Sequence, residues 1–151
     1  MLDIKWYVKE NVRDLYDKTP KPVGEGSSGI DLKTGHDFIM YPGERKTICT
    51  GLHCELPEEY SFFIIPRSGL SAKAGITIVN SPGNIDPSYR GELKIILLNT
   101  GDMPKNFERG DRICQGVLIH TPKSNNIFME SLEDLSKTER GTGGLGHTGS
   151  K

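Results

Sequence analysis

The chain has 151 residues, with 19 basic and 20 acidic side chains, a net charge of −1, and 34 % hydrophobic residues. This length indicates a single domain with a sizeable core, and the balanced charge argues against a general nucleic-acid-binding or anionic-membrane-binding surface. The longest apolar runs are four residues, 62–65 and 95–98, whereas a membrane span needs about 20 apolar residues. The N-terminus lacks the apolar segment of a signal peptide. We therefore expect a soluble, single-domain protein.

Turn-forming residues punctuate the chain at short intervals, with 18 glycines and 9 prolines in total. The segments between them are short and rich in β-branched and aromatic residues, and the first alternates Ile4, Trp6 and Val8 with polar neighbours, as a half-buried strand does. Strands are predicted, in chain order, at 3–9, 38–41, 47–55, 60–65, 76–79, 93–99, 112–120 and 127–129. Helix is predicted only over 68–73 and 132–138. This pattern predicts an all-β sandwich or barrel.

The three cysteines indicate a reducing compartment. Cys49, Cys54 and Cys114 are odd in number and contain no close-spaced pair, which is unlike a small secreted scaffold. Cys49 and Cys54 would face opposite sides of the strand predicted over 47–55, so they should not bond to each other. The four histidines are scattered without the spacing of a zinc site. Reduced thiols in a cytoplasmic protein are the expectation.

Two turn-rich stretches could carry chemistry. The first, Pro66-Arg67-Ser68-Gly69-Leu70, follows an apolar strand and precedes a short helix, so it could be a phosphate seat or a surface ion pair. The second, 80–91, could be a wide hairpin with an Asx turn at Asp86. It could equally be a pocket in which backbone groups bind a ring edge, Tyr89 packs against a flat face and Asp86 is a general base.

The last twelve residues, 140–151, contain five glycines and the apolar side chain of Leu145. Residues 141–146 match the letters of a dinucleotide-binding motif, but that motif requires a strand before it and a helix after it, and the given sequence ends five residues later. The segment is expected to be flexible when alone. Either it is a disordered tail, or it is a flap whose glycine amides and Arg140 wrap an anion.

Two further segments complete an ordered set: Gly29-Ile30-Asp31-Leu32 and Gly110-Asp111-Arg112-Ile113-Cys114-Gln115. With 66–70, 83–91 and 140–149 they form five motifs in order, and this set resembles the homotrimeric deoxyuridine triphosphate nucleotidohydrolases, the dUTPases. The resemblance covers nearly the whole chain. It implies a jelly-roll-like β-barrel over 1–139, with 140–151 as a glycine-rich lid of the same domain. It also implies a homotrimer whose active sites are each built from all three subunits.

The resemblance implies hydrolysis of dUTP to dUMP and pyrophosphate, with Asp86 activating the water that attacks the α-phosphorus. Mg²⁺ is expected on the triphosphate with no direct protein ligand, and Asp31 would reach it through water or brace an arginine. The implied phosphate-binding residues are Arg67, Ser68, Gly69, Gln115, Arg140, Gly141, Gly143 and Gly144. The implied uracil- and deoxyribose-binding residues are Asn80, Gly83, Asn84, Ile85, Tyr89, Lys94 and Leu145. The site of action would be the cytoplasm, or the host cytoplasm for a phage or viral protein.

Two positions depart from the family pattern. Leu145 stands where the fifth motif usually has an aromatic residue that covers the uracil, and Ser88 stands where an acid is often found. A base stacked on an aromatic ring gains ~1–3 kcal/mol, so a leucine there implies a weaker lid. Two alternatives remain open: a dCTP deaminase of the same fold, and a regulatory nucleotide-binding protein that acts on a host partner.

Overall fold

The computed structural model describes residues 2–22 and 24–143, and within them it contains eleven strands, one α-helix and two 3₁₀ helices. The strands are β1 (Lys5–Val8), β2 (Ile30–Lys33), β3 (Phe38–Met40), β4 (Arg45–Cys49), β5 (Leu52–Glu55), β6 (Tyr60–Ile65), β7 (Ile76–Ile78), β8 (Gly83–Ile85), β9 (Lys94–Asn99), β10 (Lys105–Phe107) and β11 (Arg112–His120). The helices are η1 (Glu10–Leu15), α1 (Ser68–Ala74) and η2 (Leu132–Asp134).

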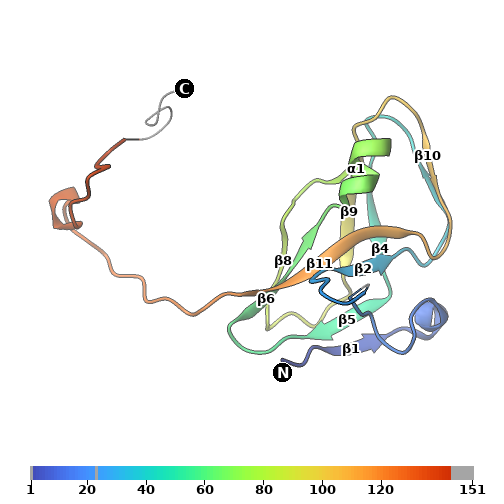
Figure 1. Ribbon diagram of the computed structural model, residues 1–151, viewed down its shortest axis with the longest axis horizontal. Coiled ribbons are helices and arrows are strands. Elements are labelled where there is room, and N and C mark those ends of the chain that lie inside the picture. The colour runs from blue at the N-terminus through green and yellow to red at the C-terminus, as the bar shows by residue number, and fades with distance from the viewer. Residues whose placement is uncertain (1, 23, 144–151) are drawn as a thin grey trace.

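Two antiparallel sheets form most of the body (Figure 1). The larger has the strand order β2-β11-β6-β8 and the smaller has the order β4-β9-β7. Two further pairs, β1 with β5 and β10 with β3, extend the body at its edges. Because neighbours in each sheet are often far apart in sequence, the chain crosses repeatedly between sheets, as in a jelly roll. The prediction of an all-β, jelly-roll-like barrel is confirmed.

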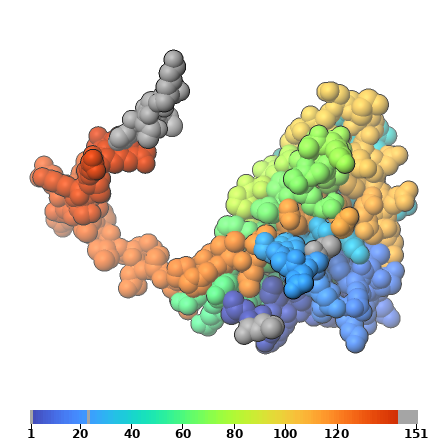
Figure 2. Space-filling model, viewed as in Figure 1, coloured from blue at the N-terminus to red at the C-terminus, as the bar shows by residue number. Residues whose placement is uncertain are grey.

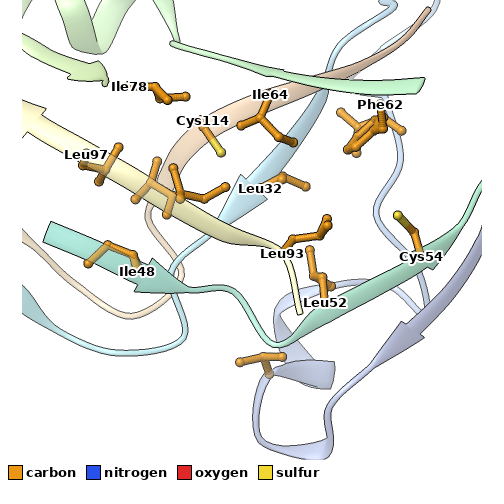
Figure 3. Packing of buried hydrophobic residues seen from close by; sticks show 14 of the residues in the cluster. Leu32, Ile48, Leu52, Cys54, Phe62, Ile64, Ile78, Leu93, Leu97 and Cys114 are labelled. Atoms are coloured by element: carbon orange, nitrogen blue, oxygen red, sulfur yellow. The ribbon is translucent and has the colours of Figure 1, made fainter. Parts of the chain in front are cut away.

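The core lies between the two sheets, and each sheet contributes alternate side chains (Figure 3). Along β9, Ile95 and Leu97 are buried while Lys94 is exposed, which is the two-residue period of a strand with one buried face. From the larger sheet, Leu32 and Phe62 are fully buried. Burial therefore alternates along β9 even where the sequence is a continuous apolar run.

The ring of Phe62 occupies space that only a glycine on the neighbouring strand can leave. A Cβ at Gly116 of β11 would lie 2.0 Å from Cζ of Phe62, far inside van der Waals contact. The Phe62 ring also packs edge-on against Trp6, with ring centroids 5.6 Å apart. The close contact between the Gly116 backbone and the Phe62 ring therefore holds β11 against β6 in the larger sheet.

The strand predicted over 47–55 is two strands instead of one. Thr50 and Gly51 separate β4 from β5, and Gly51 adopts a φ of +72° that breaks the extended backbone. The buried Thr50 hydroxyl donates to the carbonyl oxygen of Leu93 at 2.8 Å. Cys49 and Cys54 consequently lie on different strands, Cys49 exposed and Cys54 buried, and all three cysteines are free.

The prediction of a last strand over 127–129 is wrong, because these residues have no strand partner in the described chain. The helix predicted over 132–138 is reduced to the single turn η2. Residues 121–143 form an extended arm that leaves the body (Figure 1) and stands clear of it in a space-filling view (Figure 2). Phe128 on this arm is 87 % exposed.

Four elements were not predicted. One is η1, in which Val12 is the buried residue and packs next to Gly51. The others are three short strands: β2, which pairs with β11, β8, which pairs with β6, and β10, which pairs with β3. Among the described residues, no helix has the length and apolar character needed to cross a membrane.

Candidate active site

The register of the larger sheet gathers three of the predicted site residues at one of its ends. Asp31 on β2 lies opposite Gln115 on β11, and Gln115 in turn lies opposite Ile65 on β6. The chain then leaves β6 and reaches Arg67, the residue immediately before α1. A row across three strands therefore brings Asp31, Gln115 and Arg67 together although they are far apart in the sequence.

Asp31 is the centre of this cluster. One of its carboxylate oxygens accepts a hydrogen bond from Nε of Arg67 at 3.0 Å, and the other accepts one from Nη1 of Arg112 at 3.1 Å. Arg67 also donates to the backbone oxygen of Arg112 at 3.2 Å. The side chains of Asp31 and Arg67 are 16 % and 27 % exposed, so water screens this ion pair less than it screens a surface pair. One carboxylate thus holds two guanidinium groups, and the cluster keeps a net positive charge.

A cleft of about 220 Å³ opens beside Asp31 and Arg67. Ser68 and Gly69, both exposed in the first turn of α1, form part of its wall, and α1 has no side-chain cap at this end. A Cβ on Gly29 would lie 2.5 Å from Oε1 of Gln115, so a side chain there would displace the Gln115 amide. The Gln115 amide itself donates to the backbone oxygen of Pro66 at 3.0 Å. Uncapped helix N–H groups, a hydroxyl and a fixed guanidinium suit an anion such as phosphate. We call this cleft the anion seat.

The second group of predicted residues lies on the turn before β8, on β8 itself and on the loop after it. Gly83 is buried, and a Cβ there would lie 3.3 Å from Nδ2 of Asn80, so the Asn80 side chain packs on the Gly83 backbone. Asn84 donates to Oδ1 of Asp86 at 2.8 Å, and Asp86 is exposed. The amide of Tyr89 donates to the backbone oxygen of Asp86 at 3.0 Å and closes a turn. An exposed carboxylate and an exposed ring therefore stand on one tight loop. We call 80–89 the loop site.

The anion seat and the loop site of one chain are separated along the larger sheet. β8 pairs with β6 so that Ile64 is opposite Gly83 and Phe62 is opposite Ile85. Continuing this register places Asp86 beside Ser61, six residues before Arg67. At a rise of ~3.3 Å per residue, Asp86 and Arg67 lie about 20 Å apart along the strands. This span is too long for one carboxylate and one arginine of the same chain to act on a single triphosphate.

The remaining predicted residues that the structure describes make no hydrogen bond or ion pair to either group. Lys94 begins β9 in the smaller sheet and is exposed. Arg140, Gly141 and Gly143 lie on the arm, where Nε of Arg140 donates to the backbone oxygen of Gly143 at 2.7 Å. The predictions for Gly144 and Leu145 fall outside the described residues.

Sequence reasoning missed Arg112 as a second partner of Asp31. Arg112 lies within the quoted segment that ends at Gln115, and it bonds the same Asp31 that Arg67 bonds. The sequence signal was Asp31, an acid between apolar residues in 30–32. A carboxylate on a half-buried strand needs cationic partners, and in the structure Arg67 and Arg112 are those partners.

The chain is an antiparallel barrel that carries a cleft suited to an anion beside Arg67 and, apart from it, a loop with an exposed carboxylate. The match to the dUTPase family model covers residues 16–149. Two named relatives are the deoxyuridine 5'-triphosphate nucleotidohydrolases of Thermobifida fusca (strain YX) and Cutibacterium acnes. The first is 44 % identical over 145 residues, covering 94 % of this chain and 79 % of the relative. The second is 45 % identical over 131 residues, covering 86 % and 84 %. The chain belongs to the dUTPase family.

Solved structures share the fold. The dUTPase of Staphylococcus bacteriophage 80alpha with dUpNHpp superposes with a TM-score of 0.85 at 24 % sequence identity, covering 97 % of this chain and 98 % of the phage chain. A mutant dUTPase from phage phi11 of S. aureus, described with a structural Mg(II) ion, superposes with a TM-score of 0.75 at 21 % identity, covering 87 % and 99 %. At these identities the likeness establishes the jelly-roll-like barrel.

Proposed function

We propose that the protein hydrolyses dUTP to dUMP and pyrophosphate, which limits uracil incorporation into DNA and supplies dUMP for dTMP synthesis. Membership of the dUTPase family supports this activity, and relatives more than 40 % identical carry the name deoxyuridine 5'-triphosphate nucleotidohydrolase. The geometric observation that carries the proposal is the anion seat, in which Asp31 fixes Arg67 beside a phosphate-sized cleft.

Asp86 is the proposed general base. One of its oxygens is oriented by the Asn84 amide at 2.8 Å, and within the described residues the other accepts no hydrogen bond from the protein. That second oxygen can orient a water and take its proton while the water attacks the α-phosphorus in line and expels pyrophosphate. A positioned base of this kind contributes about 10²–10⁴-fold to the rate.

The phosphates are proposed to lie in the anion seat, held by Arg67, Ser68, Gly69 and Gln115. The lid, 140–151, would add Arg140 and the backbone amides of Gly141, Gly143 and Gly144. Donors fixed before the reaction stabilise the charge that develops on the non-bridging oxygens without having to reorganise. The ion pair from Asp31 to Arg67 supports this role, because it fixes the guanidinium before substrate arrives.

The uracil and deoxyribose are proposed to bind at the loop site. Backbone groups around Gly83, Asn84 and Ile85, with the Asn80 side chain, can match the donors and acceptors of uracil and reject cytosine. The ring of Tyr89 would lie under the deoxyribose, where a 2′-hydroxyl would lose hydrogen bonds to water at a cost of about 1–3 kcal/mol. Two further expected contacts come from Lys94 and Leu145.

We further propose that each active site is shared within a homotrimer. The separation of Asp86 from Arg67 supports sharing, because the loop site of one chain can reach an anion seat only on a neighbouring chain. The arm supports it as well. Ile127 is 77 % exposed and Phe128 is 87 % exposed, which is unfavourable unless another subunit covers them. A strand over 127–129 that forms only against a neighbour would explain its absence from the single chain.

Mg²⁺ is proposed to bind mainly through phosphate oxygens and water and to neutralise charge on the triphosphate. Among the described residues, no three His, Cys, Asp or Glu side chains group together as a metal cage would require. Both oxygens of Asp31 already accept hydrogen bonds from arginines, so bracing Arg67 and Arg112 is its main role, and any contact with the metal would pass through water.

The free cysteines support a reducing, cytoplasmic site of action.

The test is product formation from dUTP compared with dCTP, dTTP and UTP, with and without Mg²⁺. The proposal expects pyrophosphate from dUTP, strongly reduced release when Mg²⁺ is chelated, and little product from the other nucleotides. Ammonia release from dCTP would instead identify a deaminase. Tight dUTP binding without any product would favour the regulatory alternative, and a pull-down with and without nucleotide would then search for its partner.

A further inference from the structure

The loop that carries Asp86 and Tyr89 ends at Glu92, and both oxygens of the Glu92 carboxylate accept hydrogen bonds. The Glu92 side chain is only 14 % exposed. One of its oxygens accepts a hydrogen bond from the amide of Gly51 at 2.7 Å, and the other accepts one from Nζ of Lys9 at 2.7 Å. The next amide, that of Leu93, donates to the backbone oxygen of Leu52 at 2.8 Å. The backbone at Glu92 is therefore fixed against the turn between β4 and β5.

The anchored backbone of Glu92 in turn fixes the ring of Tyr89. The Tyr89 hydroxyl donates to the backbone oxygen of Glu92 at 3.0 Å. A Cβ on Gly91 would lie 2.3 Å from this hydroxyl, so the ring folds over a residue that has no side chain. Tyr89 is 42 % exposed, so part of the ring remains open to solvent while its hydroxyl is held.

The surroundings of Glu92 favour its ionised form. Burial raises the pKa of Glu92, but the hydrogen bonds from Lys9 and from the Gly51 amide outweigh burial, and the net pKa lies below its ordinary value. The pKa of Lys9 is raised, chiefly by its hydrogen bond to Glu92. Glu92 and Lys9 are therefore both charged near neutral pH, and their ion pair holds this end of the loop.

We propose that Glu92 is a positioning residue for sugar specificity: by fixing the backbone that accepts the Tyr89 hydroxyl bond, it holds the ring where it excludes a 2′-hydroxyl. This inference rests on the proposed hydrolysis of dUTP and on the placement of the sugar over Tyr89. A loosened ring can move away from the sugar, so loss of the anchor should relax discrimination against UTP more than it lowers turnover of dUTP.

The test measures kcat and KM for dUTP and for UTP in the wild type, Glu92→Gln, Glu92→Ala and Tyr89→Phe. The glutamine keeps an oxygen for the Gly51 amide and loses the charge that pairs with Lys9, whereas alanine loses both contacts. We expect the ratio of kcat/KM for dUTP to that for UTP to fall from the wild type to Glu92→Gln and further in Glu92→Ala. For Glu92→Ala the expected fall is about 5-fold, equal to ~1 kcal/mol at 1.36 kcal/mol per tenfold change. The double variant Glu92→Ala with Tyr89→Phe should lose little more than the larger single loss, because both act through one hydrogen bond.

Asp14→Asn is the matched control. It also replaces an ion-paired carboxylate by an amide, but the partner of Asp14 is Arg109, which makes no bond to the loop among the described residues. Thermal stability is compared across all variants, and the control should leave the dUTP to UTP ratio unchanged. An unchanged ratio in Glu92→Ala, alongside normal dUTP hydrolysis by the wild type, would overturn the role of Glu92 alone. Failure of the wild type to hydrolyse dUTP would overturn the proposed function and this inference together.

Discussion

Two inactive variants should restore each other's activity if the site is shared between chains. Asp86→Asn removes the proposed base, and its turnover should fall about 10²–10⁴-fold while binding of a dUTP analogue persists. Arg67→Gln removes the guanidinium from the anion seat, and its amide can still donate to Asp31. Each homotrimer alone should be nearly inactive, because every one of its sites carries the same defect.

The expected recovery follows from the separation of Asp86 and Arg67 in the single chain. Register on β6 and β8 keeps them about 20 Å apart along the strands, so a working site must take Asp86 from one subunit and Arg67 from another. In randomly assembled trimers of a 1:1 mixture, each wild-type residue is present in about half of the subunits. About one quarter of the sites then combine an intact Asp86 with an intact Arg67.

The assay is pyrophosphate release after co-expression of the two variants with different affinity tags and purification through both tags. Selection for both tags removes the homotrimers and so raises the recovered fraction somewhat above the random value. Wild type co-assembled with Asp86→Asn is the control, because its activity should track the fraction of intact Asp86. Activity no higher than that of the separate variants would refute the shared site, since a site within one chain can never combine the two intact residues.

Three further outcomes are expected. Truncation before Arg140 should leave a folded trimer by light scattering with little dUTP turnover, and normal turnover would contradict the lid. Gly116→Ala should lower the free energy of unfolding in urea by about 1–3 kcal/mol through overpacking against Phe62, and Phe62→Leu in the same background should recover part of the loss. The lowered pKa of Glu92 means that its ion pair stabilises the fold above the ordinary glutamate pKa and that this contribution is lost as pH falls. The stability difference between the wild type and Glu92→Gln should therefore shrink as pH falls from about 6 to about 3, and a difference independent of pH would contradict the linkage.

The strands could be predicted where one face of each is buried. The apolar runs within 60–65 and 93–99, bounded by polar or turn residues, indicate strands packed in the interior, and the structure has strands at both places. The anion seat was predictable for a different reason. Asp31, Arg67 and Gln115 were expected from the order of the motifs and the resemblance it carries, although no strand was predicted at Asp31, and it is the register between β2 and β11 that sets Asp31 beside Gln115.

The elements that sequence reasoning missed or misplaced depend on contacts with distant parts of the chain. In η1 the single buried side chain of Val12 is too weak a periodic signal to indicate a helix. The break between β4 and β5 at Gly51 is fixed by Glu92, more than forty positions later, which accepts the Gly51 amide hydrogen bond. The segment 127–129 has the side chains of a strand, but a strand also requires a partner, and the single chain supplies none among its described residues.

The order of the motifs carries no information about which of them meet. Arg67 and Asp86 are separated by α1, β7 and β8, a distance in sequence that would suit one compact site. β8 returns along β6 in the antiparallel direction, and this return places Asp86 beside Ser61 and away from Arg67. The two halves of the chemistry are then kept apart for as long as the subunit is alone. In the proposed trimer, assembly followed by closure of the glycine-rich lid brings the base and the anion seat onto one nucleotide, and water activation would then depend on neighbouring subunits.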